Sequence, residues 1–248
     1  MLPELRIQDR VATITLRRPA VANRLAPEDL AALIDHVAAV NADERVLVLR
    51  VRGEGKYFCS GYDIGKIGAG GRSVSFEAMV DAFEDARPVT IAVLHGGVYG
   101  GATDLALACD FRVGVQGIDM FMPAARLGLH FYQRGLERYV ARLGLDMAKR
   151  LFLTAQRIDA QQMRACGFLT DLVSPESLEE AVETLTGQLA GMAPIALLGM
   201  KKHLNRIARG TLDVEELNRD VARSRGSDDI REGAQAWAEK RAPRFVGR

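Results

Sequence analysis

The segment His95-Gly-Gly-Val-Tyr-Gly-Gly-Ala-Thr-Asp104 follows an unbroken apolar run, Pro88-Val-Thr-Ile-Ala-Val-Leu94. Apolar residues on both faces are typical of a strand buried in a sheet, and the glycines after it favour a tight turn before a helix over residues 100–107. A second segment of this kind, Lys56-Tyr-Phe-Cys-Ser-Gly-Tyr-Asp-Ile64, follows the apolar run at 45–51. Strand, glycine turn and helix in this order predict an α/β fold.

The rest of the chain extends this pattern. Residues 4–17 alternate around Gln8-Asp9-Arg10, which indicates a hairpin, and Pro27 followed by two acidic residues marks the start of a helix. From about residue 159 onward we expect almost only helices. The remaining elements are expected at 111–115 (strand) and at 134–143, 146–154, 159–166, 176–191, 194–208, 213–225 and 229–240 (helices).

This order divides the chain in two. We expect residues 1–190 to form the α/β core, and residues 191–248 to form a helical C-terminal region for oligomerisation and active-site cover. Between the two glycine segments, residues 65–75 contain four glycines, which is typical of a mobile loop.

Composition excludes several classes of protein. The 248 residues are 48% hydrophobic and 26% charged, which is a globular composition and not a disordered one. With 33 basic and 32 acidic residues, the net charge of +1 offers no global attraction to nucleic acid or to an anionic membrane. We expect a cytoplasmic protein without a membrane segment. The three cysteines form no metal-binding or disulfide spacing, so we expect reduced thiols and no metal.

The two glycine turns are the first candidate functional feature. Each leaves backbone N–H groups unpaired at the start of a helix, next to residues small enough for a ligand to approach, and two such turns can together hold one anionic oxygen. Glycine turns after strands are also common without any catalytic role. Neither segment fits the GxGxxG or GxxxxGK[ST] patterns of nucleotide-binding loops.

Several segments resemble the crotonase (enoyl-CoA hydratase/isomerase) superfamily. Phe58-Cys-Ser-Gly-Tyr-Asp-Ile64 is similar to the family's F-C/S-A/S-G-x-D-I/L, and residues 95–110 are similar to its N-G-x-x-x-G-G-G-x-E-L-A-x-x-C-D. Residues 17–23, 123–129 and 231–245 resemble three further family segments, in order along nearly the whole chain. The resemblance implies a ββα superhelix, or spiral, followed by a helical C-terminal region.

The resemblance also implies an activity. Members act on acyl-coenzyme A thioesters, assemble as trimers or dimers of trimers, and need no metal or prosthetic group. The backbone N–H groups of the residues matching Tyr62 and Gly101 hold the thioester oxygen. Two donors on that oxygen stabilise an enolate, which allows a proton, water, a carboxylate or a double bond to be moved at the neighbouring carbons.

The chain departs from the family's hydratases at two positions. Asp104 stands where they have one glutamate, and Ala124 stands where they have the second. The pair of carboxylates that activates water is therefore broken, and ordinary hydration is in doubt. We expect Asp104 to act as an acid or base or to orient a polar group, with the helix dipole lowering its pKa.

The segment Leu129-His-Phe-Tyr-Gln-Arg-Gly135 replaces a run of small residues in the family. His130 is a candidate acid or base because of its residue type, and Tyr132 is a candidate donor to a carboxylate or enolate. A surface or structural role remains the alternative for both. For Arg134 we expect a pairing with an acidic residue at a subunit contact.

For coenzyme A, the resemblance implies an adenine near residues 20–23 and near the backbone of residues 61–64. Lys240, or the pair Lys201 and Lys202, are candidates for the 3′-phosphate, including from a neighbouring subunit. A solvated helix face is the alternative for each lysine. The candidate cofactor-binding residues are Ala20, Ala22, Asn23, Gly61, Asp63, Ile64 and Lys240.

Three functions follow from these observations. The leading hypothesis is an enoyl-CoA hydratase/isomerase-like enzyme in which Asp104 moves a proton between carbons. The second is decarboxylation of a malonyl-type thioester, which needs only enolate stabilisation and a protonating group such as Tyr132 or His130. The third is a non-catalytic acyl-CoA binding or assembly subunit.

Overall fold

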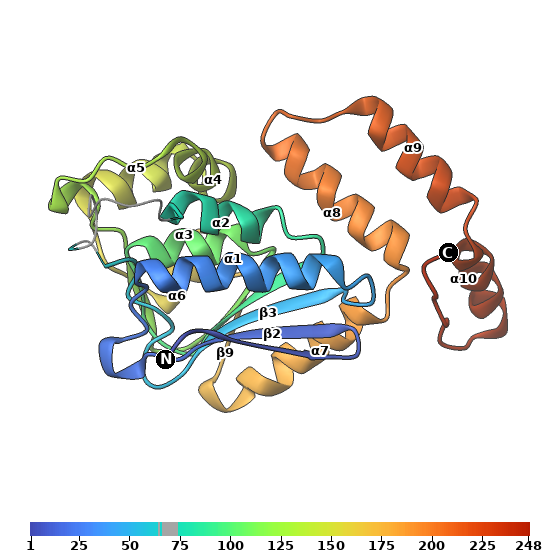
Figure 1. Cartoon of the computed structure of the whole chain (residues 1–248), viewed down its shortest axis with the longest axis horizontal. Helices are drawn as coiled ribbons and strands as arrows, with labels where there is room; N and C mark the ends of the chain where they lie inside the picture. Colours follow the sequence, from blue (N-terminus) through green and yellow to red (C-terminus); the bar gives the residue numbers. More distant parts are fainter. Residues whose placement is uncertain (64, 66–73) are drawn as a thin grey trace.

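A six-stranded sheet in the order β1-β2-β3-β4-β6-β9 forms the centre of the molecule (Figure 1). The computed structural model describes residues 1–63, 65 and 74–248 of the chain. β1 pairs antiparallel with β2, and every later neighbour pairs parallel, which confirms the α/β class. Three further strands form a second, smaller sheet in the order β5-β7-β8. The strands are β1 (Glu4–Gln8), β2 (Val11–Leu16), β3 (Val48–Gly53), β4 (Val89–Leu94), β5 (Val98–Tyr99), β6 (Phe111–Val115), β7 (Asp119–Phe121), β8 (Ile158–Asp159) and β9 (Asp171–Val173).

Burial follows the position of each strand in the sheet. All six residues of the central strand β4 are buried, whereas β1 at the edge has none that is fully buried. The hairpin predicted over residues 4–17 is the β1–β2 pair. β3 begins three residues later than predicted. The two-residue strand β8 and the three-residue strand β9 were not predicted, because so few residues carry no detectable period.

Helices cover both faces of the large sheet (Figure 1). α1, α2 and α3 pack side by side in sequence order over one face, and α7 lies against β3 and β6 on the other. The predicted helices are all present, with ends that match or differ by one or two residues, whereas α2 was not predicted. The helices are α1 (Pro27–Ala42), α2 (Phe76–Glu84), α3 (Gly101–Ala108), α4 (Gln133–Leu143), α5 (Leu145–Thr154), α6 (Ala160–Ala165), α7 (Leu178–Ala190), α8 (Pro194–Ala208), α9 (Val214–Arg225) and α10 (Asp228–Glu239), with 3-10 turns η1 (Pro19–Val21), η3 (Ala125–Leu127) and η4 (Pro175–Ser177).

Helix α1 illustrates why these elements form. Pro27 occupies its first turn, and the Asp29 carboxylate accepts a hydrogen bond from the Ala26 N–H at 2.8 Å, which caps the helix. Leu30, Leu33 and Val37 recur at helical spacing and are buried. The helix is therefore fixed by its own sequence at one end and by the sheet along its length.

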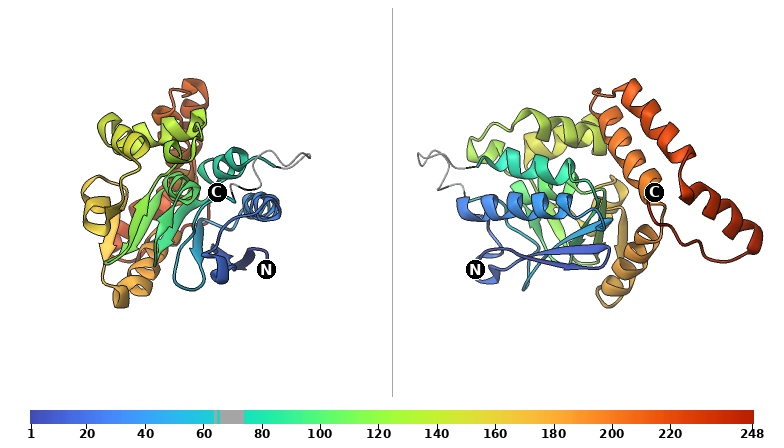
Figure 2. Two further views of the ribbon diagram at one scale, coloured as in Figure 1. Left: turned by 90° about the vertical axis from the view of Figure 1, so that its left-hand side faces the viewer. Right: turned by 45° about the vertical axis from the view of Figure 1, so that its right-hand side comes forward.

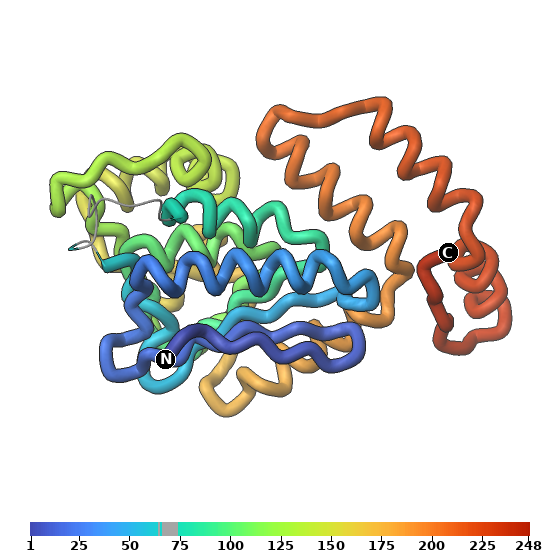
Figure 3. Tube along the Cα trace, viewed as in Figure 1, coloured from blue at the N-terminus to red at the C-terminus, as the bar shows by residue number. Residues whose placement is uncertain are grey.

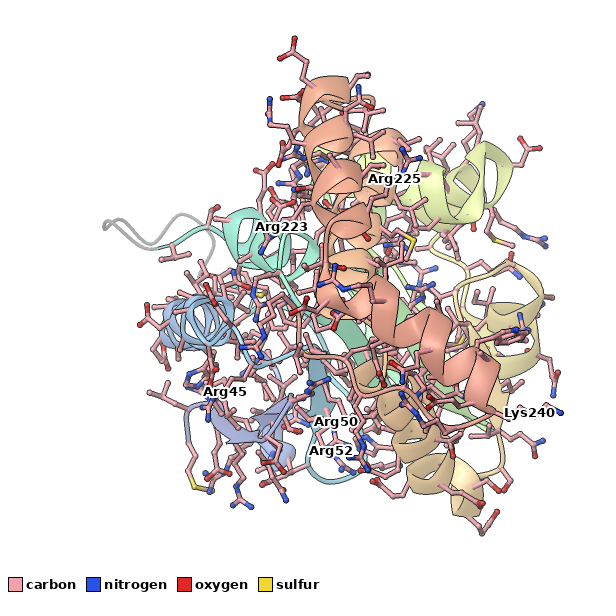
Figure 4. All side chains as sticks on the ribbon, turned by 90° about the vertical axis from the view of Figure 1, so that its right-hand side faces the viewer. Arg45, Arg50, Arg52, Arg223, Arg225 and Lys240 are labelled. Atoms are coloured by element: carbon pink, nitrogen blue, oxygen red, sulfur yellow. The ribbon has the colours of Figure 1, made fainter. Side chains whose placement is uncertain are left out.

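Ion pairs attach α7 to the sheet. Arg50 and Arg52 are two residues apart on β3 and therefore lie on the same face of the strand. The guanidinium group of Arg50 lies 2.5 Å from the Glu183 carboxylate, and that of Arg52 lies 2.5 Å from the Glu179 carboxylate, both on α7. Figure 4 shows the side chains of both arginines. These pairs are partly exposed and contribute modestly, about 0.2–1 kcal/mol each.

The last three helices extend away from the sheet (Figures 2 and 3). The tail after α10 turns back, where Arg10 donates to the carbonyls of Ala190 and Phe245 at 3.0 and 2.8 Å. The buried Asp229 carboxylate accepts from the backbone N–H groups of Val246 and Gly247. The division into 1–190 and 191–248 stays a prediction.

Two further expectations concern the course of the chain. The predicted loop at 65–75 falls mostly on residues 66–73, which lie outside the described residues. Among the described helices, none alone has the length and apolar character to cross a membrane; one pair, Pro175–Ala190 with Pro194–Ala208, meets that test jointly but is bent by 107°.

Candidate active site

The two glycine turns meet at the start of α3. A Cβ built on Gly61 would lie 2.8 Å from the Gly101 nitrogen and 2.8 Å from the Tyr99 carbonyl oxygen, so the two backbones are in contact. Gly61 has φ of +90°, a conformation that glycine adopts without strain. Within the described residues, neither the Tyr62 N–H nor the Gly101 N–H donates a hydrogen bond to the protein. Two unpaired donors therefore lie on adjacent loops.

Asn23 holds the first of these loops in place. Its side-chain Nδ2 lies 2.8, 2.9 and 3.1 Å from the carbonyl oxygens of Glu54, Tyr57 and Phe58, and its Oδ1 accepts from the Arg18 N–H. Asn23 is 1% exposed. Since the amide is buried and its bonds are internal, Asn23 supports the loop and does not present its side chain to a ligand.

The predicted coenzyme A segments lie side by side. The Ser60 N–H donates to the Ala22 carbonyl at 2.9 Å, and Ala20 is exposed one turn earlier. Asp63 accepts from the Gly65 N–H at 3.2 Å, a bond that caps the turn. Ile64 lies outside the described residues. That these residues bind coenzyme A stays a prediction.

Asp104 is enclosed by protein. It is 0% exposed, its Oδ2 accepts a hydrogen bond from the Tyr132 hydroxyl, and Arg138 Nη1 lies 2.7 and 2.8 Å from its two carboxylate oxygens. Burial raises the pKa of Asp104, although Arg138 and Tyr132 act in the opposite direction. The expectation that this pKa lies below its ordinary value is therefore wrong, because desolvation outweighs the groups that lower it.

Arg138, on α4, is the centre of a buried charge cluster. Besides Asp104, it lies 2.9 Å from Asp81 and 2.9 Å from Glu84, both on α2. Burial alone would lower the pKa of Arg138, but Asp104 and Glu84 together hold it above its ordinary value. Arg134 lies 2.5 Å from Glu84 and 3.1 Å from Asp81 in the same chain. It thus has intramolecular partners and does not depend on the subunit contact that we expected for it.

Tyr132 connects this cluster to the surface. Burial and the neighbouring carboxylate of Asp104 raise the pKa of Tyr132 above its ordinary value, so the phenol keeps its proton. Tyr132 is half-buried, whereas Asp104 is fully buried. Of this hydrogen-bonded pair, Tyr132 is the member that an incoming molecule can reach.

An aromatic wall joins Tyr132 to the two N–H donors. The Phe76 ring lies 5.9 Å from the ring of Tyr62 and 6.4 Å from that of Tyr132, measured between centroids. A Cβ on Gly101 would lie 2.6 Å from the end of the Phe76 ring, so this ring covers the start of α3. Sequence reasoning missed Phe76 and Arg138, since neither belongs to a motif.

Ala124 is an apolar residue near the start of α3. The residue is 4% exposed, and its neighbour Pro123 comes within 3.9 Å of a Cβ built on Gly100. The position at which the resemblance implies a second carboxylate thus lies beside the start of α3 and carries a methyl group.

His130 does not join the cluster. The residue is exposed, and its Nδ1 lies 2.7 Å from the Phe131 carbonyl oxygen. Its predicted role as an acid or base stays a prediction without a described partner in the site.

The candidate lysines lie elsewhere. Lys240 follows α10, at the opposite end of the molecule from α4 and α5, and is exposed (Figures 1 and 4). Only a neighbouring copy can bring it to a site near Gly101. Lys201 is buried and lies 2.8 Å from Asp110, and Lys202 pairs with Glu216 at 2.7 Å, so each has a carboxylate partner within the chain, and their contact with the 3′-phosphate stays a prediction. Among the described residues, no group of three His, Cys, Asp or Glu side chains is placed to hold a metal ion.

The geometry can be compared with known proteins. The family model described as enoyl-CoA hydratase/isomerase matches residues 6–248. The chain belongs to this family. It is therefore a member of the crotonase superfamily, as the sequence motifs predicted.

Individual relatives differ in their reactions. The chain is 28% identical to a methylmalonyl-CoA decarboxylase of Escherichia coli K12, over 96% of this chain and 95% of the relative. It is 29% identical to a crotonyl-CoA hydratase of Syntrophomonas wolfei, over 97% and 96%. A crystal structure of an enoyl-CoA hydratase from Mycobacterium tuberculosis superposes with a TM-score of 0.89 at 26% identity, covering 99% of both chains. The family and fold are thus established, and the reaction has to be argued from the site.

Proposed function

We propose that this family member decarboxylates a malonyl-type acyl-CoA thioester through an enolate held by the N–H groups of Tyr62 and Gly101. The observation that carries the proposal is the enclosure of Asp104 by Arg138 and Tyr132. The alternatives within the family need a base that contacts the substrate. The carboxylate of Asp104 is buried and cannot make that contact.

Hydration and double-bond migration both require a group that removes a proton. Hydration needs a base for water and an acid for the neighbouring carbon. Asp104 is 0% exposed and bonded through both oxygens, and Ala124 supplies no second carboxylate. A decarboxylation needs no base, because the electron pair for the enolate comes from the bond to the departing carboxylate.

The reaction balances with groups in the chain. The bond between the α-carbon and the carboxylate breaks, carbon dioxide leaves, and the electron pair passes into the thioester to form the enolate. The two N–H donors stabilise the negative oxygen; removing one such donor from other enzymes costs roughly 3–4 kcal/mol of transition-state stabilisation. A proton then adds to the α-carbon and gives the shortened thioester.

Tyr132 is the candidate donor of that proton. Its hydroxyl is held by Asp104, and its ring contacts Phe76 beside Gly101. After transfer, the phenolate would lie beside Asp104, and the positive charge of Arg138 offsets part of that repulsion. Solvent then returns the proton to Tyr132. Asp104 accordingly serves as a positioning residue.

The methylmalonyl-CoA decarboxylase among the relatives adds support, because its name denotes this reaction class. The hydratases among the relatives keep hydration and isomerisation as the alternatives to be tested. A non-catalytic acyl-CoA binding subunit is the third. Coenzyme A is the expected part of the substrate in all three.

One experiment separates these functions. Purified protein is incubated in turn with methylmalonyl-CoA, crotonyl-CoA and a 3-enoyl-CoA, and the products are followed by mass spectrometry. We expect methylmalonyl-CoA to lose 44 Da, the mass of carbon dioxide, in deuterated water with one deuterium incorporated at the α-carbon. Water addition to crotonyl-CoA, or double-bond migration, with no carbon dioxide loss would overturn the proposal. Binding of all three without turnover would favour the binding subunit.

A further inference from the structure

The peptide between Gly100 and Gly101 has a second hydrogen-bonding side. In a trans peptide the C=O and the N–H point in opposite directions, so the group that holds the Gly100 oxygen also determines the direction of the Gly101 N–H. The same peptide dipole connects them, and polarising the carbonyl strengthens the N–H as a donor.

Thr103 holds this oxygen twice. Its backbone N–H donates to the Gly100 oxygen at 3.0 Å, and its hydroxyl Oγ1 donates to the same oxygen at 2.6 Å. The first bond belongs to the start of any helix, whereas the second exists only because residue 103 carries a hydroxyl. Thr103 is 0% exposed, so water does not compete for this bond.

Tyr139 adds a further hydrogen bond behind Thr103, and the donor and acceptor of each bond in this series can be assigned. Its hydroxyl is hydrogen-bonded to Thr103 Oγ1. The Gly100 carbonyl has no proton to offer, so the Thr103 hydroxyl must donate to it, and Tyr139 must donate to Thr103. Burial raises the pKa of Tyr139 well above its ordinary value, and the phenol therefore keeps this proton.

We propose that Thr103 and Tyr139 are positioning residues that orient and polarise the Gly101 N–H through the Gly100 carbonyl. The inference rests on the proposed oxyanion role of Gly101. Both side chains are fully buried, and the chain that they form ends on the backbone, so neither touches the substrate. Cooperative strengthening amounts to roughly 10–30% per hydrogen bond.

The two donors of the site consequently differ. The Gly61 carbonyl, which shares its peptide with the Tyr62 N–H, accepts from the Leu25 N–H at 2.8 Å, and no side-chain donor to it occurs in the described part of the chain. The Gly101 donor has a hydroxyl chain behind it. Gly101 is therefore the stronger of the two donors and bears more of the developing negative charge.

The test uses a labelled thioester whose binding needs no turnover. Acetyl-CoA carrying ¹³C at the carbonyl is bound to the wild type and to variants, and the carbonyl band is measured by infrared difference spectroscopy. Thr103→Val removes the hydroxyl, Thr103→Ser restores it, and Tyr139→Phe removes the end of the chain but keeps the ring. Thr186→Val is the matched control, because Thr186 on α7 is also buried and its hydroxyl has no partner in the described residues.

We expect the band of the wild type to move to lower wavenumber on binding. Thr103→Val should lose about a fifth of that displacement, Tyr139→Phe a smaller part, and Thr103→Ser and Thr186→Val none. In turnover, kcat should fall roughly threefold to tenfold in Thr103→Val, with KM changed less than about twofold.

The outcomes distinguish the proposed oxyanion hole from the proposed role of the Thr103 and Tyr139 hydroxyls. A wild-type band that stays at its aqueous position overturns the oxyanion hole, and this inference with it. A displaced wild-type band that Thr103→Val and Tyr139→Phe leave unchanged overturns only the role of the hydroxyl chain. If Thr103→Val fails to fold by circular dichroism, Tyr139→Phe decides, since its packing is retained.

Discussion

The properties of Asp104 arise from its neighbours. Moving a carboxylate out of water costs several kcal/mol unless opposite charge replaces the lost hydration. Arg138 supplies that charge, and Tyr132 supplies a further donor. The wider cluster has four carboxylates and three guanidinium groups, a formal excess of one negative charge, which favours a neutral Tyr132. Its members are Asp81, Glu84, Asp85, Asp104, Arg134, Arg138 and Arg209.

The first prediction concerns Tyr132. Tyr132→Phe should lower kcat for decarboxylation about a hundredfold, the range of a lost general acid, with KM nearly unchanged. Because burial and Asp104 raise the pKa of Tyr132, its proton is present up to at least pH 10. The wild-type kcat should therefore not fall between pH 6 and 10.

Steady-state rates over that pH range check both statements. Tyr57→Phe is the control, since its ring packs against Tyr99 and lies outside the cluster. An alkaline fall in kcat near pH 8 that Tyr132→Phe abolishes would contradict the assigned protonation state.

The second prediction concerns Arg138 and stability. Arg138→Met should lower the free energy of unfolding by about 3–5 kcal/mol at pH 8, because it leaves buried carboxylates without their partner. In the wild type, burial alone would raise the pKa of Glu84, but Arg138 and Arg134 hold it below its ordinary value. That stability is present above the ordinary pKa of about 4.3 and is lost as the pH falls through the lowered one.

In the variant the sign reverses for Glu84, whereas burial already raises the pKa of Asp81 and of Asp104 in the wild type. Buried carboxyls without Arg138 have raised pKa values, so their stability is present at low pH and is lost as the pH rises through those values. Urea unfolding at pH 5 and pH 8 should show a smaller deficit at pH 5. An equal deficit at both pH values would show that the cluster is not coupled to protonation.

At the scale of elements, the site depends on contact between the loop after β3 and the start of α3. Cys59 and Gly61 lie in that loop, and the Tyr99 N–H donates to the Cys59 carbonyl at 3.0 Å. Since the contact is between backbones, side-chain adjustments cannot relieve a bulky residue placed there.

Gly61→Ala therefore tests the contact. The new Cβ would lie 2.8 Å from two backbone atoms, and the φ of +90° adds strain of about 1–3 kcal/mol. We expect loss of detectable turnover together with reduced thermal stability. Gly117→Ala is the matched control, with φ of +85° and no atom within 4 Å of its Cβ. Equal turnover in both variants would separate the activity from this contact.

The sequence predicted elements better than it predicted partners. The strand at 111–115 and the helix at 194–208 were predicted to the residue, because their apolar patterns are local. The pairing of Asp104 with Arg138 was not predicted, since it arises only when α3, α2 and α4 pack together. The same holds for Thr103 and Tyr139, whose hydroxyls meet across 36 positions of sequence.

At the scale of the whole molecule, the C-terminal helices expose apolar side chains. Leu204 on α8 is 64% exposed, and Trp237 on α10 is 88% exposed. Exposed apolar groups gathered on one region mark a contact surface. We predict that residues 191–248 mediate association into a trimer or a dimer of trimers.

Replacing apolar side chains on that region should weaken the assembly. Leu204→Glu combined with Trp237→Glu should shift the protein toward a single chain, measured by sedimentation velocity at several concentrations. Ile7→Glu, which adds a charge to the exposed edge strand β1, is the control and should sediment as the wild type. A wild type that sediments as one chain at every concentration would contradict the prediction.

Assembly also determines whether Lys240 can contact coenzyme A. Within one chain, α10, which Lys240 directly follows, lies well away from α3, which begins at Gly101 (Figure 1), so a contact with the 3′-phosphate requires a neighbouring copy. Lys240→Gln should then weaken binding of coenzyme A several-fold, as expected for one lost charged contact. It should leave binding of 3′-dephospho-coenzyme A unchanged, as measured by calorimetry.

In the dissociated Leu204→Glu/Trp237→Glu protein the same substitution should have no effect, because the lysine is no longer beside a site. A loss that is equal for both ligands would place Lys240 away from the phosphate.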